Sequence, residues 1–318
     1  MKANLLGLFL VFLVLCNVLQ VPAQQDEADL KTLAEVRAKA EQGDAAAQFN
    51  LGLRYCNGPG VAKDDMEAVK WFRKAADQND ADAQVYLGVC YANGQGVAKD
   101  EAEAQRWFRK AAEWFRKAAE QNEAAAQWSL GWCYGNGRGL VKDEAEAVKW
   151  YRRAAEQNNT KGQLDLGHSY AKGRGVAKDE AEAVKWYRKA AEQNNATAQL
   201  NLGLCYSKGA GVAKNEKEAM RWYRKAAEQN NAGAQLMLAA YYDNGIGVAK
   251  DEVEAYKWAL LAAGQGDKAA RDCVSILENK MSRGKLAKGQ KLARDFKPTV
   301  MPQTGSDGSG AGIIQSRP

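Results

Sequence analysis

The hydrophobic residues of this chain recur with the spacing of paired amphipathic helices. Ala47, Leu51 and Tyr55 lie four residues apart, so they share one face of a helix. A second apolar stripe follows a short loop and alternates large with small residues, which lets neighbouring helices interdigitate. Its members are Ala68, Trp71, Phe72, Ala75 and Ala76. The pattern predicts an A helix and a B helix joined by a loop.

This helix pair is repeated along the chain. Six copies open with a glutamine, and the steps between copies are 36, 43, 36, 36 and 36 residues. The six are Gln48, Gln84, Gln127, Gln163, Gln199 and Gln235. Such a period is typical of solenoids, in which each unit buries its apolar face against its neighbours.

The loop and the start of each B helix carry their own signals. A Gly-x-Gly sequence ends the A helix, because glycine adopts the left-handed backbone that closes a helix. Each B helix then opens with Asp or Asn followed three residues later by Glu, the pattern of a capping box. The six pairs are Asp64/Glu67, Asp100/Glu103, Asp143/Glu146, Asp179/Glu182, Asn215/Glu218 and Asp251/Glu254.

These motifs resemble those of the Sel1-like repeat family, which is related to the tetratricopeptide repeats. The A-x3-LG-x2-Y, G-x-G-V and W-[YF]-x2-A-A elements all occur, and the six repeats cover residues 45–265. The resemblance implies an all-α solenoid, a right-handed α/α superhelix, that serves as an adaptor for protein complexes, often in bacterial envelopes or the endoplasmic reticulum. One scaffold serves many partners, so the motif does not identify the partner.

The sequence predicts further elements at both ends. Residues 26–44 resemble a B helix without its A helix and predict an N-terminal capping helix. Residues 267–297 predict two C-terminal capping helices, and 298–318 predict a disordered tail. Residues 1–23 have a basic start, an apolar run and small residues before a cut after Ala23, which predicts a signal peptide. We therefore expect an exported protein, periplasmic or extracellular, whose mature chain does not span a membrane.

One copy departs from the period. Trp107–Glu113 is repeated residue for residue as Trp114–Glu120, which accounts for the step of 43. Seven residues are about two turns less about 20°, so the apolar stripe returns to nearly the same face. We predict a B helix about 10 Å longer. The duplication is either simply tolerated or exposes Trp107/Phe108 or Trp114/Phe115 as a binding patch.

Charge adds little to this picture. The formal net charge is +6, and Lys280–Pro318 alone holds eight Lys or Arg against two Asp or Glu. This basic segment is either solvated or makes weak contact with an anionic surface. The near-neutral repeats and the predicted export disfavour nucleic acid as a partner.

Candidate chemistry is sparse. Five cysteines remain after the signal peptide, and equivalent positions on stacked helices lie too far apart for disulfides, so we predict no disulfide framework. The one histidine, His168, occupies a register filled elsewhere by packing residues. We recognise no metal site, no cofactor site and no catalytic set.

A partner would bind where the A helices vary most between copies. The register before each Leu-Gly and the register four residues later share a face, and stacked copies would align them in a stripe. We expect partner contacts from Asn50, Arg54, Tyr86, Ser129, Asp165, Ser169, Asn201, Met237 and Tyr241; ordinary solvated variation is the alternative.

The sequence thus favours a non-enzymatic scaffold of the periplasm or cell envelope that binds protein or peptide partners on a concave A-helix face. One alternative is a structural protein tethered by its basic C-terminal segment. Another is a hydrolase of envelope polymers or β-lactams, although the cysteine-rich relatives discussed in that role have paired cysteines in each repeat, which this chain lacks.

Overall fold

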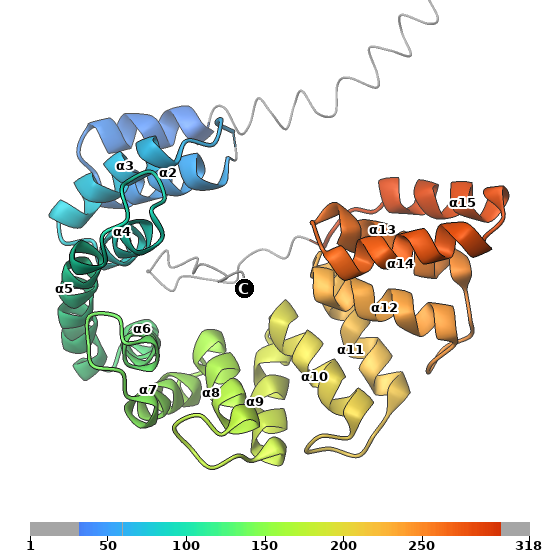
Figure 1. Ribbon diagram of the computed structural model, residues 1–318. Helices are drawn as coiled ribbons and strands as arrows, with labels where there is room; N and C mark the ends of the chain where they lie inside the picture. The colour runs from blue at the N-terminus through green and yellow to red at the C-terminus, as the bar shows by residue number, and fades with distance from the viewer. Residues whose placement is uncertain (1–31, 59, 300–318) are drawn as a thin grey trace, which may run out of the picture. The chain divides into compact units, whose positions relative to one another are not determined.

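The computed structural model describes residues 32–58 and 60–299, and in these ranges all regular structure is helical (Figure 1). The predicted signal peptide, residues 26–31 of the predicted N-terminal cap and residues 300–318 of the predicted tail lie outside the described residues. A helix over residues 32–41 precedes the repeats. The helices that follow are α2 (Ala45–Asn57), α3 (Asp65–Asp77), α4 (Ala81–Asn93), α5 (Glu101–Glu120), α6 (Ala124–Asn136), α7 (Glu144–Glu156), α8 (Thr160–Lys172), α9 (Glu180–Glu192), α10 (Ala196–Lys208), α11 (Glu216–Glu228), α12 (Ala232–Asn244), α13 (Glu252–Gly264), α14 (Lys268–Lys280) and α15 (Arg283–Arg294).

Consecutive helices pack in pairs, so the chain forms an all-α solenoid of helical repeats, as predicted. The even-numbered members from α2 to α12 are the A helices, and the odd-numbered members from α3 to α13 are the B helices. The described residues form two compact units. One contains residues up to Lys117 together with 136–141, and the other contains 118–135 and 142–299.

The predicted helix starts are confirmed at the atomic level. The side chain of the Asp or Asn before each of the six B helices accepts a hydrogen bond from the backbone N–H of the Glu three residues later, at 2.9–3.1 Å. In α3, α7 and α9 the Glu carboxylate contacts a lysine three residues further on, as Glu182 contacts Lys185 at 2.8 Å. The acidic first turn thus satisfies the helix N-terminus and orders the following turn.

Five of the six A helices approach their B helix through a glycine, and in α12 this position is Ala239. A Cβ on Gly203 would lie 2.5 Å from Cε1 of Tyr223, and the equivalent glycines of four other A helices face an aromatic ring equally closely. Tyr223 and Phe72 are fully buried as a result. The glycine therefore sets the distance at which the aromatic ring of the B helix closes the core of each repeat.

Buried glutamines connect successive repeats. The Nε2 of a glutamine after a B helix donates to the Oε1 of the buried glutamine 30 residues earlier, at 2.7–2.8 Å. The pairs are Gln78–Gln48, Gln157–Gln127, Gln193–Gln163, Gln229–Gln199 and Gln265–Gln235. Each buried glutamine also donates to a backbone carbonyl eight residues earlier. We call this set the glutamine ladder.

The duplication interrupts the ladder once. Thirty residues after Gln84 lies Trp114 instead of glutamine, and the buried Oε1 of Gln84 has no hydrogen-bond partner. The helix α5 has 20 residues where the other B helices have 13, which confirms the predicted extension.

Helix α5 packs against its neighbours in two registers of the repeat pattern, which differ by seven residues. Gly88 of α4 faces Phe108, 20 residues later, as the glycines of the other A helices face their own rings. Gly139 of the next loop approaches the backbone of Phe108, which lies 31 residues earlier in the sequence. In other copies, the residue 31 positions before the equivalent glycine is the first residue of the B helix. The preceding repeat therefore packs in the register counted from the start of α5, and the following loop packs in a register shifted by seven residues. Trp107, Phe108 and Phe115 are buried, and only Trp114 is exposed, at 44%.

The C-terminal helices α14 and α15 cover the last repeat. Leu277 of α14 joins the core that contains Tyr256 and Trp258 of α13. The Phe296 ring packs edge-on against Trp258 at 5.5 Å, and the Thr299 backbone N–H donates to the Glu228 carbonyl at 2.8 Å. Within the described ranges no helix is both long and apolar enough to span a membrane.

Candidate functional site: a polar cluster on the A helices

Four polar side chains connect three consecutive A helices in the second unit. The Trp128 indole N–H of α6 donates to Oδ2 of Asp165 on α8 at 2.8 Å. The Nδ1 of His168, one turn along α8, lies 3.6 Å from Oδ1 of Asp165. On the other side, Asn201 Nδ2 of α10 lies 2.9 Å from Nε2 of His168. We call Trp128, Asp165, His168 and Asn201 the polar cluster.

The cluster is open to solvent in its middle. The side chains of Asp165 and His168 are 31% and 33% exposed, and Asn201 is also half-buried. The His168 ring packs edge-on against Tyr187 of α9 at 5.5 Å, and the Lys161 ammonium lies 4.7 Å from the Trp128 ring. The sequence predicted His168 to be a packing residue; it does pack, but a third of it faces solvent and it bonds to Asn201.

The cluster is specific to its own copies. The His168 register holds Leu53, Val89, Trp132, Leu204 and Ala240 elsewhere, and the Trp128 register holds Phe49, Val85, Leu164, Leu200 and Leu236. Polar groups thus occupy a place where other repeats carry apolar ones. Since the partners lie 33 and 37 residues apart in sequence, only the stacking of the A helices brings them together.

The nine residues predicted to bind a partner differ in how accessible their side chains are to solvent. Asn50 is exposed, and Arg54, Asp165, Asn201 and Met237 are half-buried. The other four are buried: Tyr86, Ser129, Ser169 and Tyr241 are only 5–7% exposed. Asp165 and Asn201 are joined through His168.

The buried members have packing roles. Tyr86 contacts the rings of Phe49 and Phe72 at 5.2 and 5.3 Å. The Tyr241 hydroxyl donates to Oε2 of Glu216 at 2.6 Å, which lowers the pKa of that carboxyl. The Ser169 hydroxyl donates to the backbone carbonyl of Asp165 at 2.8 Å, so its proton is bound within its own helix. Tyr86 and Tyr241 thus hold an A helix and a B helix together.

The remaining candidate groups are also placed by the structure. Cys56, Cys90, Cys133, Cys205 and Cys273 are all free thiols. Burial raises the pKa of Cys90 and of Cys133 to about 12. In the ranges that the structure describes, no group of three or more His, Cys, Asp or Glu side chains is placed to hold a metal ion. Two cations of the basic C-terminal segment, Lys280 and Lys285, pair with Asp243 and Glu252.

This arrangement defines a class of protein: a helical repeat array that presents side chains from successive A helices along one face. The chain belongs to the Sel1 repeat family. The family model, described as Sel1 repeat, matches residues 45–80, 81–113, 110–123, 124–159, 160–195, 196–231 and 232–267. The short third match covers the second copy of the duplicated heptapeptide, so seven matches correspond to six helix pairs in the described chain.

Solved structures agree with this assignment. The chain is similar to a Sel1 repeat protein from Oxalobacter formigenes, with 34% identity, a TM-score of 0.56, and coverage of 76% of this chain and 94% of that one. An immunity protein from Pseudomonas aeruginosa shares the fold alone, with 19% identity, a TM-score of 0.52, and coverage of 69% of this chain and 81% of that one. No curated protein matches the chain. Sel1 repeat proteins are generally scaffolds for protein interactions, and protein partners are expected for this chain.

Proposed function

We propose that the protein is a non-enzymatic scaffold of the periplasm or cell envelope, and that a protein partner binds on the A-helix face at the polar cluster. The observation that carries this proposal is the partly exposed Asp165–His168–Asn201 array, which spans two A helices and is anchored to a third by Trp128. These groups offer a carboxylate, an imidazole and an amide to one ligand. Their partners within the protein hold them in place, so little side-chain entropy is lost on binding.

Within the second unit the proposed face includes Met237, the accessible stripe residue one copy after Asn201. Asn50 and Arg54 are the accessible stripe residues of the first unit and are proposed as partner contacts of that unit by itself. Tyr86, Ser129, Ser169 and Tyr241 belong to the proposal only as supports, because their side chains are buried. Export rests on the predicted signal peptide. The tether alternative receives less support, since Lys280 and Lys285 are already paired with carboxylates of the repeats.

A site-specific cross-linking experiment tests the proposal. A photo-reactive amino acid at position 201 is compared with one at position 185 on the outward side of α9, in cells that express the chain natively. We expect one discrete cross-linked protein from position 201 and none from 185. Asp165→Ala, His168→Leu and Asn201→Ala combined should abolish capture through a probe at position 237.

His168→Leu is the chosen substitution because Leu204 fills this register one copy later, so the fold is retained. Circular dichroism of the triple variant controls for folding. Equal cross-linking from positions 201 and 185, or capture that is unaffected by the triple substitution, would reject this binding face.

A further inference from the structure

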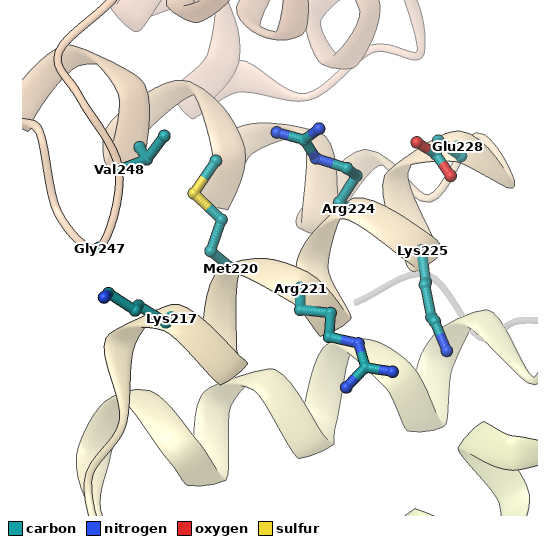
Figure 2. A pocket seen from close by; sticks show the side chains of 8 residues that line it. All are labelled: Lys217, Met220, Arg221, Arg224, Lys225, Glu228, Gly247 and Val248. Carbon is teal, nitrogen blue, oxygen red and sulfur yellow. The ribbon is translucent and has the colours of Figure 1, made fainter.

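A second surface, on the B-helix side, carries a pocket that the polar cluster does not include. The pocket has a volume of about 450 Å³ and lies along α11 against the loop that follows α12 (Figure 2). Its lining residues are Lys217, Met220, Arg221, Arg224, Lys225, Glu228, Gly247 and Val248. The volume is sufficient for a few residues of a peptide.

The chemistry of the pocket is cationic around an apolar floor. Met220 is buried, and Figure 2 shows its side chain directed towards Val248, with Lys217 and Arg224 on either side. Arg221 and Lys225 directly follow Met220 and Arg224 in the sequence, so the lining residues include four cations and one carboxylate, Glu228. A ligand for this surface must therefore combine negative charge with an apolar group.

These cations are less neutralised than their counterparts in other B helices. Arg221 lies 3.6 Å from Glu218, whereas Lys149 and Lys185 in the same register contact their glutamates at 2.7 and 2.8 Å. Lys217 makes no ion pair within 4 Å among the described residues. Arg224 donates to the Tyr242 hydroxyl, which holds its guanidinium in position without cancelling its charge.

The pocket is also specific to this repeat. One copy earlier, on α9, the equivalent residues are Ala181, Val184, Lys185, Arg188, Lys189 and Glu192, with Gly211 and Val212 in the loop. Only two lining positions change character, because Lys217 replaces an alanine and Met220 replaces a valine. The same alanine stands at positions 102 and 145 in α5 and α7. Helix α9 of the same chain therefore serves as a matched control for the pocket on α11.

We propose that this α11 pocket binds an acidic peptide segment of a protein partner, with carboxylates on Lys217 and Arg224 and an apolar side chain on Met220 and Val248. Charge complementarity is the argument for this ligand, because four cations around a buried methionine match acidic residues that flank an apolar one.

The test is fluorescence anisotropy of the purified protein at low ionic strength. The probe is a fluorescein-labelled hexapeptide with three glutamates and one leucine, and its control has glutamines in place of the glutamates. We expect binding of the acidic probe only, and a loss of affinity of about tenfold with Lys217→Glu. Lys189→Glu makes the same charge change on α9 and should leave affinity nearly unchanged.

A gain-of-function variant distinguishes loss of the binding site from loss of folding. Ala181→Lys with Val184→Met gives α9 the two residues that distinguish α11, and it should raise the stoichiometry from one to two peptides. Equal losses with Lys217→Glu and Lys189→Glu would show attraction to net charge alone and overturn the proposal. Absence of binding, binding of the glutamine control, or displacement of the probe by an equal concentration of inorganic phosphate would overturn it as well.

Discussion

Replacing two buried glutamines with methionine, one at a time, tests whether the glutamine ladder is interrupted at Gln84. Gln84 and Gln163 are equally buried, at 2% and 1% exposure, and methionine has nearly the same shape. Gln163 makes three hydrogen bonds: it donates to the Ala155 carbonyl and to Asn158, and it accepts from Gln193. Gln84 donates to the Ala76 carbonyl at 3.2 Å, and its Oε1 has no partner.

The magnitudes follow from these contacts. A hydrogen bond contributes about 0.5–1.5 kcal/mol net, so Gln163→Met should lower the free energy of unfolding by about 2–4 kcal/mol. Gln84→Met loses one bond but also removes a buried acceptor without a donor, which itself costs about 1–3 kcal/mol. We therefore expect Gln84→Met to change stability by less than about 1 kcal/mol.

The assay must be local, because the two residues lie in different compact units and a repeat array need not unfold in one step. Amide hydrogen exchange, followed by mass spectrometry, reports the opening free energy of peptides from α4 and α8 separately. Exchange in α8 should accelerate by about 30-fold or more with Gln163→Met, and exchange in α4 should hardly change with Gln84→Met.

Gln235→Met serves as the control for position, since Gln235 makes the same three hydrogen bonds as Gln163, with the Ala227 carbonyl, Asn230 and Gln265, and should behave like it. Equal acceleration at Gln84 and Gln163 would refute the reasoning. It would mean that Gln84 gains a donor from solvent and that the ladder is continuous.

Three further predictions concern other parts of the molecule. Deletion of Trp114–Glu120 places Gln121 thirty residues after Gln84, so it should restore the missing ladder bond and raise the free energy of unfolding of α4 by about 1–3 kcal/mol; a destabilised α4 in hydrogen exchange would contradict this. Iodoacetamide at pH 8 should label the half-buried Cys56 and Cys273 before Cys90 and Cys133, whose pKa burial raises to about 12, and peptide mass spectrometry would expose the reverse order. Hydrogen bonds from Tyr241 and Lys214 hold the pKa of Glu216 below its ordinary value of 4.5, so the stability from this contact is present above pH 4.5 and is lost as the pH falls through the lowered pKa. The difference in urea midpoint between the wild type and Tyr241→Phe should accordingly shrink as the pH is lowered below 4.5, and a constant difference would argue against a role for the charge.

The helices were predictable because their signals are local. Capping residues such as Asp64 act on a backbone N–H three residues away, and the apolar stripes repeat within one helix, so the sequence alone defines the ends and the buried faces. The longer α5 was predictable for the same reason, since seven residues preserve the stripe.

The polar cluster was not predictable, because its members lie on different repeats. Trp128, Asp165 and Asn201 meet only when the stacking of the A helices is known, and the histidine between them occupies an otherwise apolar register. The one sequence signal was that register, where a histidine replaces the leucine, valine, tryptophan or alanine of the other copies.

The predicted partner face mixed accessible and buried residues for a related reason. Variation between copies shows that a register tolerates change, but not whether each change is solvated or compensated by a neighbour. Tyr86 packs against the aromatic rings of Phe49 and Phe72, and Tyr241 faces Tyr223 and Glu216. These differences are compensated within the core.

The two registers of α5 bear on how such an array can grow. An insertion in a helix rotates everything beyond it by about 100° per residue, so five added residues would turn the stripe by about 140° and direct its aromatic rings into solvent. Seven residues return it to within about 20° of its starting direction. A gene for this protein can therefore gain length in steps much shorter than one repeat and still encode a folded chain. In this chain, the added residues leave one buried amide oxygen, on Gln84, without a hydrogen-bond donor.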